Sequence, residues 1–196
     1  MKSPSLLKRC GFPVLAALVG FGFTSCATAD RDHTLIVSVP EQRLVLLEKG
    51  APVASYRIST SRYGIGDSPG SYATPLGTLE VADMIGGNAP LGTVFKDRRP
   101  TGEVIKPNAP GRDPIVTRII WLRGLEDRNR NAFARFIYIH GTPQENKLGR
   151  PASYGCIRMG SQDVADLFAR IGVGAQVKVI ETPVQHALGS PVHSEG

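Results

Sequence analysis

His140 and Cys156 are two residues whose chemical types together could carry out a reaction. A cysteine thiol is mostly protonated at neutral pH, and a neighbouring imidazole can take its proton and turn the sulfur into a nucleophile. The pair therefore predicts covalent catalysis, with His140 as base and Cys156 as nucleophile. Gly155 permits a tight turn, so that the backbone amides of Gly155 and Cys156 could point at a developing oxyanion.

Two further polar residues lie in the same short segment as the cysteine. Arg158 follows Cys156 by two positions, and its planar guanidinium could hold a substrate carboxylate through two parallel hydrogen bonds. Ser153 precedes the cysteine, where its hydroxyl could support the pair, although serine is also common in turns. The segment thus has the residue types of a catalytic turn.

The amino-terminal residues indicate export. Lys2, Lys8 and Arg9 precede an uncharged, largely apolar run over residues 11–23, which ends in small residues. This pattern is typical of a secretory signal peptide, and the run is shorter than the roughly 20 apolar residues that a membrane span needs. We therefore expect a signal peptide over residues 1–25 and a protein located in the periplasm or cell envelope.

Two cleavage sites compete at the end of this signal. Residues 23–26, FTSC, are similar to a bacterial lipobox, in which Cys26 would become a lipidated first residue that anchors the protein to the membrane, although Phe23 replaces the usual aliphatic residue. Residues 27–29, ATA, offer an A-x-A site for ordinary release. We favour lipidation, because Cys26 directly follows the apolar run.

The cysteine count supports a reactive thiol. Of the three cysteines, Cys10 leaves with the signal and Cys26 lies at or near the new terminus, which leaves Cys156 alone in the folded domain. Most free cysteines are small buried apolar residues, but an unpaired thiol in an exported protein risks oxidation. Its neighbours Gly155 and Arg158 suit a polar turn better than a core strand.

Charge and motif spacing exclude several function classes. The formal net charge of +6 falls to a surplus of 3 when the three basic residues of the signal are removed, leaving 20 basic against 17 acidic residues. Export and the absence of alternating aromatic and basic residues argue against a nucleic-acid partner.

A structural zinc site needs about four ligands, and no CxxC or second nearby histidine supplies them. The histidine also precedes the cysteine, unlike in papain-like enzymes. We expect no metal and no cofactor.

Acidic residues are interspersed among the arginines between Arg98 and Arg135, which we interpret as a solvated face. The acidic residues are Glu103, Asp113, Glu126 and Asp127.

About 165 residues remain after the signal, enough for one domain with a real core. Alternating apolar patterns and turn residues predict strands over residues 35–39, 43–47, 53–59, 77–84, 117–122, 136–139 and 176–180. One helix is expected directly after the cysteine turn, capped by Ser161 and stopped by Gly172. We expect a linker over residues 26–33, a domain over residues 34–182 and a frayed tail over residues 183–196.

The motifs together resemble those of bacterial L,D-transpeptidases. Their active-site signature is HG, some dozen residues, and then S/T-H-G-C-x-R/N, and here HG occurs at residues 140–141 and SYGCIRM at residues 153–159. Segments upstream are also similar, namely STS at 59–61, GSY at 70–72, TPLG at 74–77 and TGE at 101–103. The likeness covers most of residues 35–181.

The resemblance implies a mainly β fold, an L,D-transpeptidase-like β-sandwich catalytic domain with one helix after the active-site cysteine. It further implies that the protein attacks peptidoglycan stem peptides at the L-centre of the third residue and forms a thioester while D-alanine leaves. Cys156 would be nucleophile, His140 base, Ser153 a polar support, and Arg158, Tyr154 and Gly141 substrate contacts. Tyr154 replaces the usual histidine of the signature and could line the groove or donate a hydrogen bond.

The resemblance leaves the acyl acceptor open. An amine from another stem peptide, a lysine of an acceptor lipoprotein or water could resolve the thioester, and water would make the protein an L,D-carboxypeptidase or endopeptidase. An alternative of another class is a noncatalytic peptidoglycan-binding lipoprotein of the same fold. The presence of both His140 and Cys156 argues against that alternative.

Overall fold

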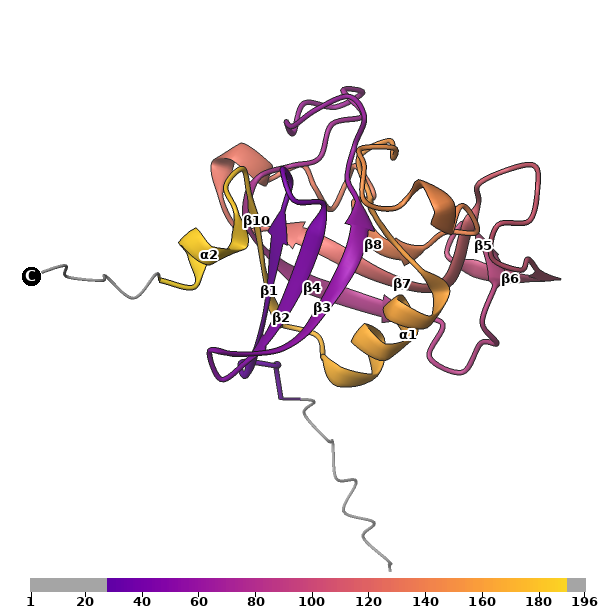
Figure 1. Ribbon diagram of the computed structural model, residues 1–196, viewed down its shortest axis with the longest axis horizontal. Helices are drawn as coiled ribbons and strands as arrows, with labels where there is room; N and C mark the ends of the chain where they lie inside the picture. The colour runs from indigo at the N-terminus through magenta and orange to yellow at the C-terminus, as the bar shows by residue number, and fades with distance from the viewer. Residues whose placement is uncertain (1–27, 190–196) are drawn as a thin grey trace, which may run out of the picture.

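The fold is mainly β, as predicted. Figure 1 shows the computed structural model, which describes residues 28–189. In this part of the chain the strands are β1 His33–Ser38, β2 Arg43–Glu48, β3 Ala51–Ser59, β4 Gly77–Ile85, β5 Thr93–Lys96, β6 Arg99–Val104, β7 Ile115–Gly124, β8 Tyr138–Gly141, β9 Ile157–Met159 and β10 Gln176–Ile180. The helices are α1 Ser161–Arg170 and α2 Val184–Ala187, with 3-10 turns η1 Asp127–Asn129 and η2 Glu145–Lys147.

The strands form one sheet that folds back on itself. Their order is β4-β10-β1-β2-β3-β9-β8-β7-β5-β6, and an additional pairing of β4 with β7 closes the first eight strands. Figure 1 shows β1, β2 and β3 in front of β4, β7 and β8, so the closed sheet has two facing layers. Strands β1, β2 and β3 pair antiparallel in sequence order, so the chain opens as a β-meander.

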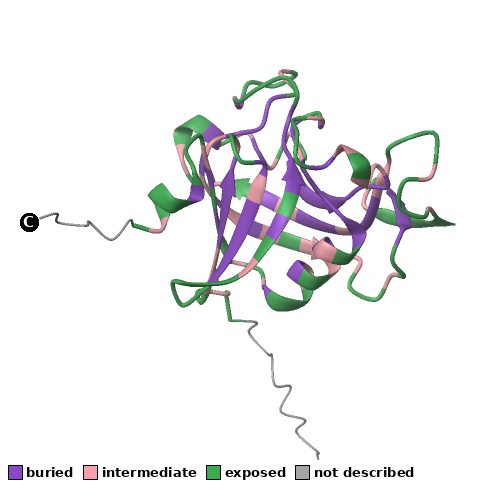
Figure 2. Ribbon diagram, viewed as in Figure 1, coloured by how far each residue is buried: buried purple, intermediate pink, exposed green. Residues whose placement is uncertain are grey.

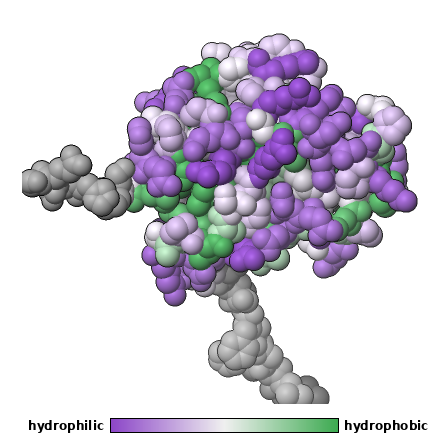
Figure 3. Space-filling model, viewed as in Figure 1, coloured by the Kyte–Doolittle hydropathy of each residue, from purple (hydrophilic) through white to green (hydrophobic). Residues whose placement is uncertain are grey.

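Apolar side chains from both layers fill the space between them. Figure 2 shows buried residues along the inner strands, and the fully buried side chains include Leu35, Leu46, Ile120 and Ile139. Burial of branched apolar residues on facing strands provides the main driving force for this arrangement. The face seen in Figure 3 is mostly hydrophilic. Between residues 28 and 189, no helix combines the length and apolar character required to cross a membrane.

The helix after the cysteine turn forms as expected, but its cap differs. Helix α1 buries Val164 and Leu167 in the core, while Phe168 is only partly buried. Ser161 is the first helical residue, and its hydroxyl accepts a hydrogen bond from Thr117 at 2.8 Å. The Glu145 carboxylate instead accepts from the Ser161 amide at 2.8 Å. A side chain distant in sequence thus satisfies the free amide at the helix start.

Two predicted boundaries are wrong. The predicted strand over residues 136–139 begins only at Tyr138, because Phe136 has a φ of 57°, which a strand does not allow. The expected frayed tail from residue 183 contains helix α2, whose Val184 is 1% exposed and packs with Ile36 and Val45. Residues 190–196, and with them half of the predicted tail, lie outside the described residues, as do Cys10 and Cys26.

A hairpin that the sequence analysis missed extends the sheet beyond the closed part. Strand β5 pairs with β7 and β6, and every residue of β6 is exposed. Residues 99–104, RPTGEV, lack the apolar alternation that predicts a strand. Pairing with β5 therefore forms β6 without a buried face.

Candidate active site

His140 lies in the middle of the sheet, near the end of β8. This strand pairs antiparallel with β7 and parallel with β9. The imidazole is 6% exposed, and its Nδ1 lies 2.8 Å from the backbone oxygen of Gly141. A carbonyl only accepts, so Nδ1 carries the proton and Nε2 of the neutral ring is left as a base. No residue between 28 and 189 forms a hydrogen bond with Nε2.

Gly141 contributes through its backbone, which corrects the expected substrate contact. The residue is buried, and a side chain there would meet the Val116 oxygen at 2.6 Å. Its carbonyl orients the His140 ring from below the surface. Glycine is needed at this position because the neighbouring strand approaches too closely for a Cβ atom.

The turn before Cys156 is held by Ser153 and requires a glycine. Gly155 has a φ of +115°, and a Cβ atom there would lie 3.2 Å from the Ala73 oxygen. The buried Ser153 hydroxyl donates to the Cys156 carbonyl at 2.5 Å and accepts from the Gly155 amide at 3.2 Å. Ser153 is therefore a positioning residue for the cysteine turn.

This arrangement changes the expected oxyanion site. The Gly155 amide is already used by Ser153 and is not free to bind an oxyanion. The Cys156 amide has no hydrogen-bond acceptor among residues 28–189. Of the two amides predicted for this role, only that of Cys156 is available in this structure.

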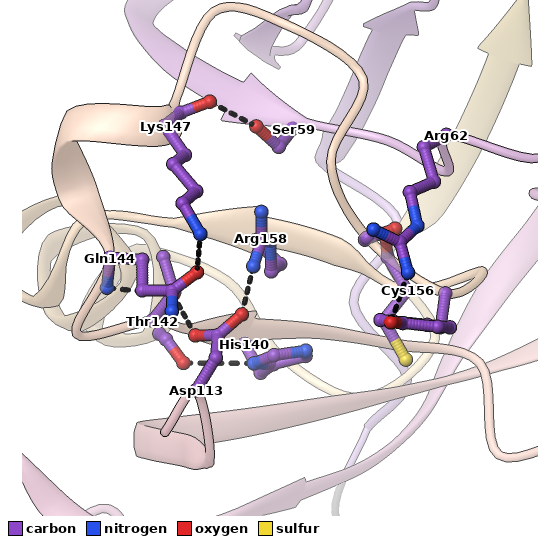
Figure 4. A network of polar contacts seen from close by, with 12 residues as sticks. Ser59, Arg62, Asp113, His140, Thr142, Gln144, Lys147, Cys156 and Arg158 are labelled. Carbon is purple, nitrogen blue, oxygen red and sulfur yellow. Dashed lines mark hydrogen bonds and ion pairs between the residues drawn. The ribbon is translucent and has the colours of Figure 1, made fainter. Parts of the chain in front are cut away.

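The Cys156 thiol lies on the side of the site toward which the imidazole points. Figure 4 shows the His140 ring extending in the direction of the Cys156 sulfur. The half-buried Cys156 packs against the apolar cluster around Phe95 and Tyr138, and its thiol donates to the Phe136 carbonyl at 3.4 Å. Phe136, whose carbonyl accepts this hydrogen bond, is the residue with the left-handed backbone conformation.

Burial keeps both members of the pair neutral. It lowers the pKa of His140 to about 4, opposed by the Gly141 carbonyl and the Asp113 carboxylate, while Arg158 acts in the same direction as burial. Burial also raises the pKa of the Cys156 thiol to about 11, against the Tyr138 amide and the charges of Arg135 and Arg158. At neutral pH the free site therefore holds a thiol and an uncharged imidazole rather than an ion pair.

Arg158 lies beside His140 in the neighbouring strand and is paired with Asp113. The two residues His140 and Arg158 are register partners between β8 and β9. The Arg158 Nη1 donates to Asp113, which also accepts from Thr142. Arg158 is 4% exposed, and its Nε and Nη2 are buried without a partner in this part of the chain. Unsatisfied buried donors are costly, so this guanidinium is suited to receiving an acceptor.

Asp113 is a residue that sequence reasoning missed. We interpreted it as part of a solvated, mixed-charge face, but its carboxylate forms the ion pair with the buried Arg158. Figure 4 shows Asp113 between Thr142 and Arg158. Lys147 and Gln144 lie on the same side of the site and form a hydrogen bond with each other. Its only sequence signal is an acidic residue preceding a strand, which does not distinguish it from its neighbours.

A long loop fixes the other side of the cysteine turn. Residues 60–76 connect β3 and β4, and Ser61 forms a β-bridge with Ser153. Thr74 donates from its hydroxyl to the Gly155 carbonyl at 3.0 Å. Arg135 ties the loop to the segment before β8 through the Asp67 carboxylate at 3.0 Å. Tyr154 is 58% exposed at this junction, among the side chains of the loop.

The described residues contain no group of three or more His, Cys, Asp or Glu side chains that could hold a metal ion. The site's reactive groups are the thiol, the imidazole and the donors around them.

The sheet places His140 near the end of β8 and the turn that carries Cys156 directly before the neighbouring strand β9. The YkuD model, described as the L,D-transpeptidase catalytic domain, matches residues 32–179. The chain belongs to this family.

Relatives and solved structures agree with this assignment. The chain is 37% identical over 51 residues to "Probable L,D-transpeptidase YbiS" of Escherichia coli, covering 26% of this chain and 17% of that protein. It is also 37% identical over 54 residues to "Probable L,D-transpeptidase ErfK/SrfK" of Salmonella typhimurium, covering 28% and 18%. These matches thus span less than a fifth of each relative.

The solved structures support the fold. An L,D-transpeptidase from Mycobacterium tuberculosis aligns with a TM-score of 0.50 at 16% identity, over 76% of this chain and 58% of that chain. L,D-transpeptidase 3 from the same organism aligns with a TM-score of 0.50 at 17% identity, over 76% and 61%. At such low identity the likeness concerns the fold alone.

The raised thiol pKa gives a test of the resting state. We expect the rate of Cys156 alkylation by iodoacetamide to rise about tenfold for each pH unit between pH 7 and about 10, because the reactive thiolate is a small fraction below its pKa. Quenched samples analysed by intact mass would give the rate at each pH. A rate that levels off below pH 8 would show a preformed thiolate and contradict the neutral pair.

Proposed function

We propose that this protein is a cysteine-dependent L,D-transpeptidase that acts on peptidoglycan stem peptides in cell-wall crosslinking or remodelling. Family membership and the names of the relatives support the reaction class. The observation that carries the proposal is the His140 tautomer, which leaves Nε2 as a base on the side of Cys156.

The first half of the proposed reaction forms a thioester. The Cys156 sulfur attacks the carbonyl carbon of the third stem residue while His140 Nε2 takes the thiol proton. The Cys156 amide donates to the developing oxyanion. The bond to the terminal D-alanine then breaks, and the imidazolium returns the proton to the leaving amine.

The second half releases the acyl group. An acceptor amine attacks the thioester carbon, and His140 takes a proton from that amine. The carbon–sulfur bond breaks and the proton passes from the imidazolium to the thiolate, which restores the free site. The acceptor amine belongs to another stem peptide or to a lipoprotein lysine, and water in its place gives carboxypeptidase or endopeptidase action.

Arg158 has the proposed role of binding a substrate carboxylate. Its Nε and Nη2 lack partners, while Nη1 is held by Asp113, so the fork is fixed with two donors free. Both free donors are shielded from solvent, and a carboxylate reaches them only after neighbouring side chains shift. Such a contact would replace two unsatisfied donors by charged hydrogen bonds.

Replacing Cys156 by alanine tests the nucleophile. We expect Cys156→Ala to lower stem-peptide conversion by about 1,000-fold or more, because no other thiol is available in the domain. Mass spectrometry of muropeptides incubated with the mature protein measures conversion and identifies the acceptor. Intact mass should show an acyl adduct on the unsubstituted protein and none on the variant. Conversion by a correctly folded variant at the original rate would exclude Cys156 as nucleophile.

Replacing Arg158 by lysine tests the carboxylate contact. Arg158→Lys keeps the charge but loses the planar fork, so a bidentate contact should weaken by about 1–3 kcal/mol, which corresponds to an approximately 5- to 150-fold lower kcat/KM for a tetrapeptide stem. Alkylation of Cys156 should be unaffected. Arg112→Lys is the matched control, because Arg112 forms an exposed ion pair with Glu103.

Two outcomes would redefine Arg158. Unchanged turnover in Arg158→Lys would remove the carboxylate role. Equal losses of turnover and alkylation would make Arg158 a structural support of the cysteine turn.

Export and anchoring are part of the proposal and rest on residues 1–26. Removal of the signal before Cys26 would leave a lipidated amino terminus at the membrane, facing the periplasm. We expect intact-mass analysis of membrane-extracted protein to show a diacylglyceryl group on Cys26, and Cys26→Ala to move the protein into the soluble fraction. An unmodified amino terminus at Asp30 would instead show ordinary release.

A further inference from the structure

We propose that Arg62, Tyr63 and Tyr154 form a second carboxylate subsite beside Cys156, which takes a carboxylate of the stem peptide. The inference rests on the proposed function, because it concerns the substrate of the same site. We refer to these three residues as the Arg62 subsite.

The Arg62 subsite is fixed to the cysteine turn by the backbone. The Arg62 amide donates to the Ser153 carbonyl at 3.2 Å, next to the bridge between Ser61 and Ser153. Figure 4 shows the Arg62 guanidinium close to Cys156, on the other side of the site from Asp113. The Arg62 subsite is therefore attached to the turn that carries Cys156.

Aromatic rings hold the guanidinium in place. The Arg62 Cζ lies 4.4 Å from the ring centroid of Tyr154 and 5.1 Å from that of Tyr63. The two rings contact each other at 5.5 Å, and Tyr72 packs on both at 5.8 and 5.9 Å. Cation–π contacts of this kind restrict an otherwise flexible side chain, so the positive charge has a defined position.

The hydrogen bonds in the Arg62 subsite leave only donors for a ligand. Arg62 Nη2 donates to the Tyr63 hydroxyl at 3.1 Å and to the Tyr154 hydroxyl. Each phenol oxygen accepts from arginine, so each phenol hydrogen remains available to a further acceptor. A guanidinium beside two phenol hydroxyls that can still donate, with no carboxylate paired to it, suits an anion.

No carboxylate of the described chain occupies this position. Arg62 takes part in none of the ion pairs found between residues 28 and 189, whereas Arg135 and Arg158 are each paired with an aspartate. A peptide that carries carboxylates and passes across Cys156 complements this unpaired charge. Stem peptides are such ligands, and the three rings would contact the apolar parts of their chain.

The subsite also explains what Tyr154 does in place of the histidine of the family signature. Its hydroxyl and ring face both contact Arg62, so a neutral side chain at this position lets the arginine approach. A protonated imidazole there would repel the guanidinium. Tyr154 and Arg62 thus act as one unit in this chain.

Binding of stem peptides to Cys156→Ala protein tests the subsite without turnover. The ligands are a tetrapeptide stem with free carboxylates and a set in which each carboxylate in turn is a carboxamide, measured by isothermal titration. We expect one carboxamide to bind about 5-fold or more weakly than the free acid, because it loses a charged contact. In Arg62→Gln protein this preference should disappear at that carboxylate, while the preference at the carboxylate that Arg158 is proposed to bind should persist.

Two further variants separate the contacts. Tyr154→Phe keeps the ring under the guanidinium but removes the hydroxyl. It should reduce the logarithm of the ratio between the carboxamide and free-acid Kd values by about half or more. Arg31→Gln is the matched control, an exposed arginine with no ion pair that lies in the segment preceding β1, and should leave every affinity unchanged.

The outcomes separate this inference from the proposed function. If stem peptides bind and the unsubstituted protein converts them, but Arg62→Gln retains the full preference for every carboxylate, the Arg62 subsite is wrong and the function stands. If no stem peptide of either form binds or is converted, both proposals are wrong.

Discussion

The parallel pairing of β8 with β9 is the constraint on which the site depends. It places Ile139 opposite Ile157 and His140 opposite Arg158, so the cysteine turn must enter the sheet next to the histidine strand. Parallel neighbours cannot be joined by a tight hairpin, and residues 142–156 make the crossover. The Ile139 and Ile157 side chains are fully buried, so slipping the register by one residue would expose core residues and separate the reactive pair.

The crossover is held at both ends by hydrogen bonds to other segments. Thr142 begins it with an amide donating to Met159 at 3.0 Å, and its end is held by loop 60–76 through Ser61 and Thr74. Segments far apart in sequence therefore fix the cysteine turn from two sides. A turn fixed in this way can keep the Cys156 amide directed at one point, and preorganised donors are the most effective in acyl transfer.

The main strands were predicted from the sequence, and His140 and Cys156 were singled out as candidates, because both have local signals. A lone thiol in a glycine turn and a histidine after an apolar run are visible in single segments, and so is the stripe of α1. Asp113, Arg62 and the Glu145 cap became visible only in the structure, because each acts on a partner at least 16 residues away. The hairpin of β5 and β6 was missed for a related reason, since its outer strand has no buried face. Gly141 and Gly155 both lie in the site, but their backbone groups form hydrogen bonds within the protein: the Gly141 carbonyl with His140 and the Gly155 amide with Ser153. The sequence does not show which backbone groups are already used in this way.

The neutral resting pair and the charged neighbours suggest how substrate binding would activate the site. Burial lowers the pKa of His140, and the Arg158 charge lowers it further, so the imidazole is a weak base in the free protein. A carboxylate bound to the two free Arg158 donors would offset that positive charge and raise the basicity of the ring. A thiol with a pKa of about 11 meanwhile reacts slowly with oxidants, which would suit an unpaired cysteine under the proposed export. Under the proposed function, the same buried arginine therefore helps to keep the imidazole a weak base in the empty site and prepares it when the substrate arrives.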